Sequence, residues 1–299
     1  MIHTFQISKS MDYSTYCKII ASLEQVNYDK NSNKSYLCSY YGLYEQGITI
    51  EFKRFALCSR ESQYVIDYII NPSRLCGNDS FLALYLHDIS IDIPARINNL
   101  LLGKSKYLPL ADECNLTRCD FTFDVKMNSE KAVKDYIKLL NRAYIPNGFE
   151  RYMIYSRSSK RAVLSKNDFN TFIKNRINIQ IYNKKEAILD HNRRSIKKHR
   201  YSTADIEQTK GIVRFEIRLM RHLINGICQK RSISSLNDFL NCSQEICDEL
   251  FTYYFEKIFG GHRFLTLRDT IDLIESSGFY QKTKCELIDF VKTVNEKEV

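Results

Sequence analysis

The sequence predicts an α+β protein built mainly on antiparallel sheet, with two β-α-β-β-β halves, helices on one face and a helical C-terminal region. Two observations lead to this fold class. A strand, a helix and three strands occur twice in that order, and helical spacing replaces strand patterns after Met220. The predicted boundaries are 1–110 for the N-terminal half, 111–225 for the second half and 226–299 for the helical region.

The elements expected in the N-terminal half are a strand at 2–7, a helix at 11–23, strands at 35–44, 48–57 and 64–70, and helical spacing over 81–102. Ser10 is the candidate N-cap of the first helix. Asn71-Pro72 ends the last strand, because proline restricts the residue before it. Ile93-Pro94 must either interrupt a helix or start one.

The elements expected further on are a strand at 116–125, a helix at 129–142, strands near Tyr152 and at 176–183 and 211–219, and helices at 235–240, 243–258, 266–276 and 282–295. Residues 190–209 include HNRRSIKKHR and have no apolar periodicity. We expect a long loop or a short polar helix there.

The chain is basic and has the composition of a globular protein. Of its 299 residues 44% are hydrophobic and 26% charged, and 44 Lys and Arg against 35 Asp and Glu give a formal net charge of +9. An excess of positive charge favours polyanionic partners such as nucleic acid. A basic surface with no binding role is the alternative.

Ten cysteines are spread along the chain without a CxxC pair. This spacing excludes a zinc ribbon and a disulfide scaffold. Cys119 and Cys247 fall at apolar-face positions, so we expect buried free thiols in a reducing cytoplasm. No signal-peptide core and no run of eighteen apolar residues occurs, so neither export nor a membrane partner is expected.

Three predicted strands each have one apolar and one polar face, because side chains alternate along a strand. The polar faces carry Arg118, Asp120, Thr122 and Asp124 in the first, Asn178, Gln180, Tyr182 and Lys184 in the second, and Arg214, Glu216 and Arg218 in the third. If the strands are neighbours, these residues converge. The alternative is a solvated face with charges paired across strands.

Such a convergence would form a site for phosphodiester transesterification. Asp120, Asp124 and Glu216 supply the hard oxygen ligands that Mg²⁺ or Mn²⁺ prefers, and the metal would polarise a phosphate. Tyr182 is the candidate nucleophile. Lys184 and Arg214 would complete the catalytic set by stabilising developing negative charge.

Four blocks resemble the replication initiators of rolling-circle plasmids and filamentous phages: YIINPSRL at 68–75, NLTRCDFTFDV at 115–125, INIQIYNKKEAI at 177–188 and GIVRFEIRL at 211–219. The helical end is also similar, so the resemblance covers about residues 60–299. The His-hydrophobic-His signature of better-known rolling-circle nucleases is absent, which excludes a metal-binding histidine pair and favours a branch that uses carboxylates.

The resemblance implies a function, a site and partners. It implies an enzyme that nicks and rejoins one strand of an origin through a covalent phosphotyrosine, with Tyr182 at the nucleophile position and Asp120 and Glu216 at metal positions. It also implies double- and single-stranded origin DNA, a host helicase and polymerase, a bacterial cytoplasm and a homodimer. A relaxase or transposase with the same chemistry, and a non-catalytic repressor-like DNA-binding protein, are the alternatives.

Three features leave alternatives open. Tyr155 competes with Tyr182 as nucleophile. The candidate DNA-binding residues flanking these tyrosines are Arg157, Lys160, Arg161, Arg193, Arg194, Lys197, Lys198 and Arg200, although a charge run is often only solvated. In the tail, the helices around Gly278 form either a DNA-reading helix-turn-helix, with Lys282 and Lys284 on DNA, or a hairpin for packing or dimerisation.

Overall fold

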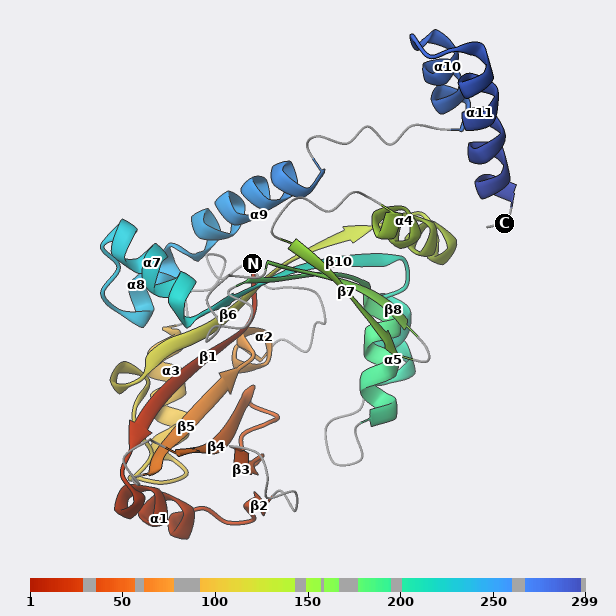
Figure 1. Cartoon of the computed structure of the whole chain (residues 1–299). Coiled ribbons are helices and arrows are strands. Elements are labelled where there is room, and N and C mark those ends of the chain that lie inside the picture. The colour runs from red at the N-terminus through yellow and green to blue at the C-terminus, as the bar shows by residue number, and fades with distance from the viewer. Residues whose placement is uncertain are drawn as a thin grey trace. The chain divides into compact units, whose positions relative to one another are not determined.

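A single ten-stranded sheet organises the protein (Figure 1). The computed structural model describes residues 1–28, 36–56, 62–77, 92–142, 149–156, 159–166, 177–194, 201–259 and 267–296. The strands are β1 (Ile2–Met11), β2 (Asn27–Tyr28), β3 (Tyr36–Tyr40), β4 (Ile48–Ala56), β5 (Ser62–Ile70), β6 (Asn115–Lys126), β7 (Phe149–Ser156), β8 (Ser159–Lys166), β9 (Ile177–Asn183) and β10 (Ile212–Met220). All neighbouring pairs are antiparallel, which confirms the predicted fold class.

The sheet consists of two halves with the same strand order. The order is β2-β3-β4-β5-β1 in the first half and β7-β8-β9-β10-β6 in the second, and β1 pairs with β6 to join them. A helix follows the first strand of each half, namely α1 (Tyr13–Ser22) and α4 (Glu130–Arg142). The predicted repeat is therefore present, with one more strand per half than expected.

The remaining helices are α2 (Pro72–Leu75), α3 (Ile93–Leu102), the short 3-10 turn Ala111–Glu113, α5 (Lys184–Arg194), α6 (Thr203–Gln208), α7 (Arg221–Arg231), α8 (Leu236–Asn241), α9 (Ser243–Phe259), α10 (Leu267–Ser276) and α11 (Gln281–Glu296). The described helices include none that is long and apolar enough to cross a membrane. The sequence did not predict α7, whose central Gly226 lowers helix propensity.

Helices cover the apolar face of the sheet. In the first half, Tyr16 of α1 stacks on Tyr64 and meets the edge of Phe52. In the second half, the aromatic contacts are Phe123 with Phe251, Phe215 with Phe255 and Tyr136, and Phe121 with Phe239. These contacts place aromatic rings between α1, α4, α8, α9 and the strands. Phe121 and Phe239 are fully buried there, whereas Phe123 is 42% exposed.

Polar caps fix where the first helices begin. The prediction of Ser10 as N-cap is wrong, because β1 continues to Met11 and Asp12 instead accepts a 2.7 Å hydrogen bond from the Thr15 amide. Asn71 ends β5 and caps α2, as expected for a strand terminus before proline. Ile93-Pro94 starts α3, since proline is tolerated in the first turn. Of the predicted span 81–102, residues 81–91 lie outside the described chain.

The structure divides into two compact units, Met1–Phe255 and Glu256–Val299. In the first unit, α7 to α9 follow the sheet, and the buried thiols of Cys119 and Cys247 lie where the sequence predicted apolar positions. In the second unit, α10 and α11 form a hairpin in which Lys284 Nζ donates 2.7 Å to the Glu275 carbonyl at the end of α10. Its exposed aromatic side chains include Phe279 and Phe290.

Candidate functional site

The three polar strand faces lie side by side in the structure. β10 lies between β6 and β9, and their register forms three rungs: Asp120–Arg218–Asn178, Thr122–Glu216–Gln180 and Asp124–Arg214–Tyr182. We call these nine residues, together with Arg118 on β6 and Lys184 directly after β9, the polar grid. The alternation of side chains therefore predicted which residues share a face, and the sheet order brings those residues together.

Tyr182 makes a direct contact with a grid carboxylate. Its hydroxyl donates a 3.0 Å hydrogen bond to Glu216 Oε2, and both side chains are buried, Tyr182 being 7% exposed. The contact is diagonal, since Tyr182 is opposite Arg214 and Glu216 is opposite Gln180. A phenol whose proton already points to a carboxylate is arranged for proton transfer.

Arg214 and Asp124 form the most deeply buried ion pair of the grid. Arg214 is fully buried, and its Nε and one Nη donate to the two oxygens of Asp124, each at 2.6 Å. Burial alone would lower the pKa of the Arg214 guanidinium, but the pair with Asp124 and the nearby Tyr182 raise that pKa above its ordinary value. Arg214 therefore stays cationic beside the phenol.

A second cluster of charge surrounds Asp120. Arg118 donates to both of its oxygens, and so does Arg218, from Nε at 2.9 Å and from Nη2 at 3.0 Å. The same Nη2 atom donates 3.2 Å to Glu216 Oε1. The two carboxylates are thus joined through one guanidinium nitrogen.

The predicted metal ligands Asp120, Asp124 and Glu216 do not all lie within reach of one ion. The described residues contain no group of three or more His, Cys, Asp or Glu side chains that could hold a metal. Asp120 and Asp124 lie four residues apart on β6, about 13 Å along the strand, which is too far for one ion with bonds of about 2 Å. Asp120 and Glu216 are nearer to each other, since one nitrogen of Arg218 contacts both, and the Thr122 hydroxyl opposite Glu216 is buried without a hydrogen-bond partner among the described residues. Two carboxylates and a hydroxyl suit Mg²⁺ or Mn²⁺.

His3 belongs to the site, although the sequence gave no indication of it. Strict alternation would place it with Phe5 and Ile7, but the β1–β6 register shifts between Ile2 and Thr4. Burial lowers the pKa of His3 well below 6.5, and the positive charges of Arg214, Lys184, Arg118 and Arg218 lower it further. Its imidazole is therefore neutral at neutral pH and lies near the cations of the grid.

This lowered pKa makes stability depend on pH. Folding weakens proton binding by His3, so the unfolded chain takes up the proton more readily and the free energy of unfolding falls as the pH drops below about 6.5. We expect His3→Asn to reduce this fall between about pH 7 and pH 5, measured by urea unfolding. His222→Asn, at an exposed site on α7, is the control. An unchanged pH profile for His3→Asn would contradict the prediction.

Asn183 fixes the end of β9 just after the nucleophile candidate. Its Oδ1 accepts from the Glu186 amide at 3.3 Å, the contact of an N-cap for α5, and its Nδ2 donates 3.0 Å to Glu130. Glu130 also accepts from the Gly211 amide before β10. The Glu130 carboxylate on α4 therefore holds the end of β9, which carries Tyr182, next to the start of β10, which carries Glu216.

We expect Asn183→Ala to destabilise the protein by about 2 kcal/mol, because it removes a cap and leaves Glu130 short of one donor. Asp12→Ala removes only the exposed cap of α1 and should cost about 1 kcal/mol. The measurement is the free energy of unfolding in urea. Equal losses for the two variants would show that the Glu130 contact contributes nothing.

The N-terminal half contains a counterpart of this contact. Asp67 on β5 is opposite Ser8 and Glu51, as Glu216 on β10 is opposite Thr122 and Gln180. Ser8 Oγ and Lys53 Nζ each donate to Asp67 at 2.5 Å, with Lys53 on the same diagonal that Tyr182 occupies. A lysine there cannot form a phosphotyrosine, so the chemistry predicted for the grid belongs to the second half.

The other predicted residues fall in several places. Lys184 is buried at the start of α5, directly after the β9 strand. Tyr155 lies on β7, which β8 and β9 separate from β10, so its backbone is about 14 Å from the strand that carries Glu216. This spacing favours Tyr182 as the nucleophile.

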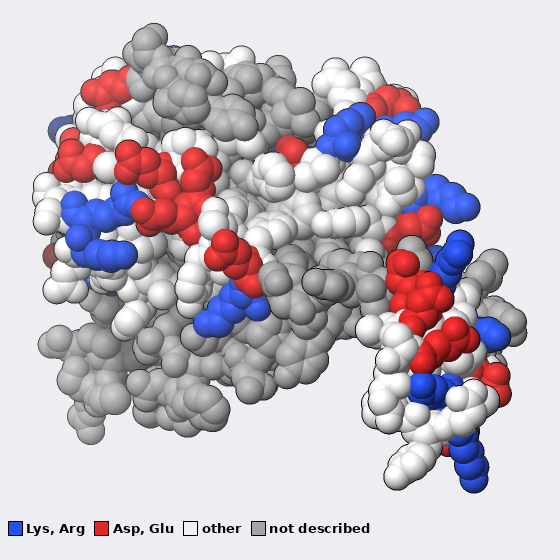
Figure 2. Space-filling view, turned by 90° about the horizontal axis from the view of Figure 1, so that it is seen from above, with Lys and Arg blue, Asp and Glu red and all other residues white. Residues whose placement is uncertain are grey.

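The candidate DNA-binding residues are spread over both described and undescribed segments. Lys160 and Arg161 belong to β8, Arg193 is exposed on α5, Arg194 ends that helix and Lys282 is exposed on α11, while Arg157, Lys197, Lys198 and Arg200 lie outside the described residues. In the view from above, acidic side chains gather in one group at the left, next to a smaller basic group, and no large basic patch is visible among the described residues (Figure 2). The net positive charge is therefore not concentrated on that face.

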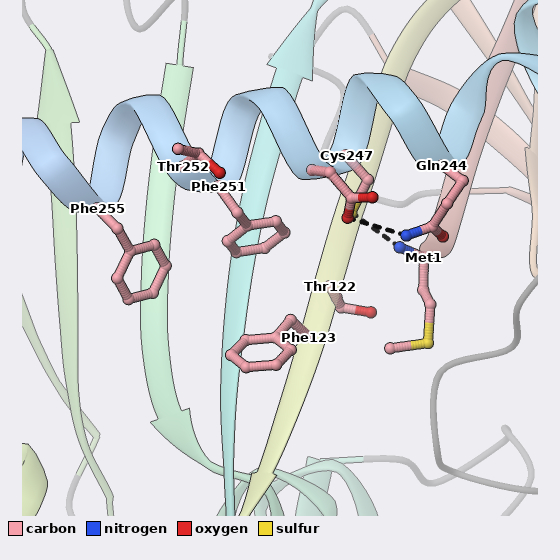
Figure 3. A pocket seen from close by; sticks show the side chains of 9 residues that line it. Met1, Thr122, Phe123, Gln244, Cys247, Phe251, Thr252 and Phe255 are labelled. Atoms are coloured by element: carbon pink, nitrogen blue, oxygen red, sulfur yellow. Dashed lines mark hydrogen bonds between the residues drawn. The ribbon is translucent and has the colours of Figure 1, made fainter.

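A pocket of about 440 Å³ lies between α9 and β6, on the side covered by helices (Figure 3). Its lining residues are Met1, Thr122, Phe123, Gln244, Cys247, Asp248, Phe251, Thr252 and Phe255. The phenyl rings give it an apolar end, and Gln244 donates 2.9 Å to Asp248 at the other. None of the predicted catalytic or metal-binding residues lines it, but Thr122 of the polar grid does, so the pocket reaches the grid at that residue.

The grid has four cations, Arg118, Lys184, Arg214 and Arg218, against the carboxylates of Asp120, Asp124 and Glu216. One excess positive charge beside a phenol suits an anionic substrate group.

The chain matches no protein-family model, and no curated protein or solved structure is significantly similar to it.

Proposed function

We propose that the protein initiates replication of a small plasmid or phage by nicking and rejoining one strand of the origin. The hydrogen bond from the buried Tyr182 hydroxyl to Glu216, inside a cluster with an excess of cations, is the observation that supports this function. A phenol, an adjacent carboxylate and guanidinium groups are the parts that phosphodiester transesterification requires.

In the proposed reaction, the Tyr182 oxygen attacks the scissile phosphorus while its proton passes to Glu216 Oε2. The bond from phosphorus to the 3' oxygen breaks, and that oxygen receives, through water, the proton that Glu216 accepted. The products are a 5'-phosphotyrosine and a free 3'-hydroxyl for a polymerase. Attack by a later 3'-hydroxyl on the phosphotyrosine reverses these steps and closes the strand.

The chain's own residues would have distinct roles in this reaction. Arg214, fixed by Asp124, stabilises charge on the phosphate next to the phenol, and Lys184 adds positive charge at the same end of β9. Asp120 and the Oε1 atom of Glu216 would hold a divalent metal, leaving Oε2 for the phenol proton. When bound, Mg²⁺ or Mn²⁺ polarises the phosphate.

The test maps the covalent link. The full chain is incubated with Mn²⁺ and single-stranded fragments tiled from the DNA that carries its own gene, digested, and analysed by mass spectrometry. We expect a nucleotide adduct on the peptide that contains Tyr182. An adduct on Tyr155 would move the nucleophile to β7, and the absence of any adduct with every fragment would reject the enzyme.

One observation favours a second candidate, a non-catalytic sequence-specific DNA-binding protein. Asp120, Asp124 and Glu216 all have arginine partners, as in a polar face that is only structural. In that case gel-shift binding would occur with neither nicking nor an adduct. The leading proposal, replication initiation, has three further parts. They are contacts with a host helicase and polymerase, a homodimer, and DNA reading by the α10–α11 hairpin.

A further inference from the structure

Arg218 occupies the space between the two carboxylates that suit a metal. Its Nη2 atom lies 3.0 Å from Asp120 Oδ2 and 3.2 Å from Glu216 Oε1. Asp120 is 1% exposed, and Glu216 is also buried. A cation that contacts one oxygen from each carboxylate is what a bridging Mg²⁺ or Mn²⁺ would be, at shorter distances.

The oxygens around this position are not all satisfied. The Thr122 hydroxyl and the Asn178 side-chain carbonyl are buried without hydrogen-bond partners among the described residues. Thr122 is opposite Glu216, and Asn178 is opposite Arg218. Native proteins leave few buried polar atoms unpaired, so these two oxygens are candidates for contact with a bound metal ion or its waters.

The arginines of the grid differ in freedom to move. The Arg218 and Arg118 side chains are 27% and 23% exposed, whereas Arg214 has no exposed surface. A guanidinium binds phosphate as readily as carboxylate, through two parallel hydrogen bonds. Arg118 and Arg218 can therefore turn toward a phosphate at the surface, while Arg214 stays with Asp124.

Charge balance determines the order of binding. The grid already has one more cation than carboxylates, so a divalent ion entering beside Arg218 would meet unfavourable charge. A phosphate that takes Arg218 away from Asp120 and Glu216 removes that obstacle and adds negative charge. Metal and phosphate should therefore each strengthen the binding of the other.

We propose that Arg218 is a placeholder cation, which holds Asp120 and Glu216 together until a DNA phosphate draws it away and admits the metal. This inference rests on the proposed function, and it adds a regulation of the same site. The chain would then take up metal together with DNA, which would keep Tyr182 inactive toward phosphates until a strand is bound.

The test is a Mn²⁺ titration of the full chain, followed by the paramagnetic resonance signal of free Mn²⁺, with and without a ten-nucleotide oligothymidylate. For the natural chain we expect the oligonucleotide to tighten Mn²⁺ binding about tenfold. For Arg218→Gln we expect Mn²⁺ binding about tenfold tighter than the natural chain without oligonucleotide, and little further gain when it is added. Equal or weaker Mn²⁺ binding by Arg218→Gln overturns the inference.

Matched variants separate the placeholder from general charge loss. Arg231 also bridges two carboxylates, Glu245 and Glu249, and is 20% exposed, so Arg231→Gln should leave Mn²⁺ binding unchanged. Arg218→Lys keeps a cation and should bind Mn²⁺ as weakly as the natural chain; binding as tight as that of Arg218→Gln would overturn the inference. Asp120→Asn should abolish the oligonucleotide effect.

If Arg218→Gln does not fold, the natural chain decides: no tightening of Mn²⁺ binding by the oligonucleotide overturns the placeholder. Failure here is distinguishable from failure of the enzyme. An adduct on Tyr182 without coupling would reject only the placeholder. Coupling without any adduct would reject only the nicking reaction.

Discussion

Tyr182→Phe should abolish nicking of supercoiled DNA that carries the chain's own gene and flanking sequence. The variant keeps the ring in its buried place but removes the oxygen that would attack phosphorus and the hydrogen bond to Glu216. Loss of a nucleophile lowers the rate by at least about a thousandfold. The measurement is conversion of supercoiled to open-circular DNA in Mn²⁺, with gel shift to show that binding remains.

Tyr155→Phe is the matched comparison, since Tyr155 lies three strands from the one carrying Glu216. It should nick at the natural rate. If the two variants exchange behaviour, the nucleophile is on β7 and the grid has another role. The loss of one buried hydrogen bond in Tyr182→Phe should lower stability by only about 1 kcal/mol, so a folded protein is expected for the assay.

The sequence predicted the polar grid because strand alternation is a strict local rule. TRCDFTFD, NIQIYN and RFEIR each divide into two faces whatever their neighbours are, and the same apolar positions that marked the strands now contact α4 and α9. The sequence did not predict β8, because this strand lacks such an alternation. Its sequence SKRAVLSK has no alternation, so only pairing with β7 and β9 defines it as a strand.

The sequence alone does not determine the register between strands that lie far apart in the chain. His3 joins the grid through a register shift in β1, and no local pattern reveals a shift that depends on pairing with β6. Which arginine meets which carboxylate likewise depends on register. The sequence suggested three acids around a metal. In the structure, Asp124 is separated from Asp120 along β6 and is paired with Arg214 instead.

Because Asp124 is paired with Arg214, we expect its replacement to lower the free energy of unfolding strongly. Asp124→Ala leaves the fully buried Arg214 guanidinium without its bidentate partner. Breaking a buried ion pair from one side costs about 3–5 kcal/mol, and we expect the lower end because Tyr182 and Glu216 also stabilise the Arg214 charge. Urea unfolding measures the loss. Glu245→Ala, at a 74% exposed partner of Arg231, should cost less than about 1 kcal/mol.

A double variant separates the stability of the pair from its chemistry. Replacing both partners, as in Asp124→Leu with Arg214→Met, removes the buried charge altogether, and such replacements are often neutral or stabilising. We therefore expect the double variant to recover most of the stability that Asp124→Ala loses, while nicking stays lost because Arg214 no longer faces the phosphate. Recovery of nicking with stability would mean that Arg214 serves the fold alone. If the double variant is as unstable as Asp124→Ala, the Asp124–Arg214 ion pair itself stabilises the fold, beyond neutralising the two buried charges.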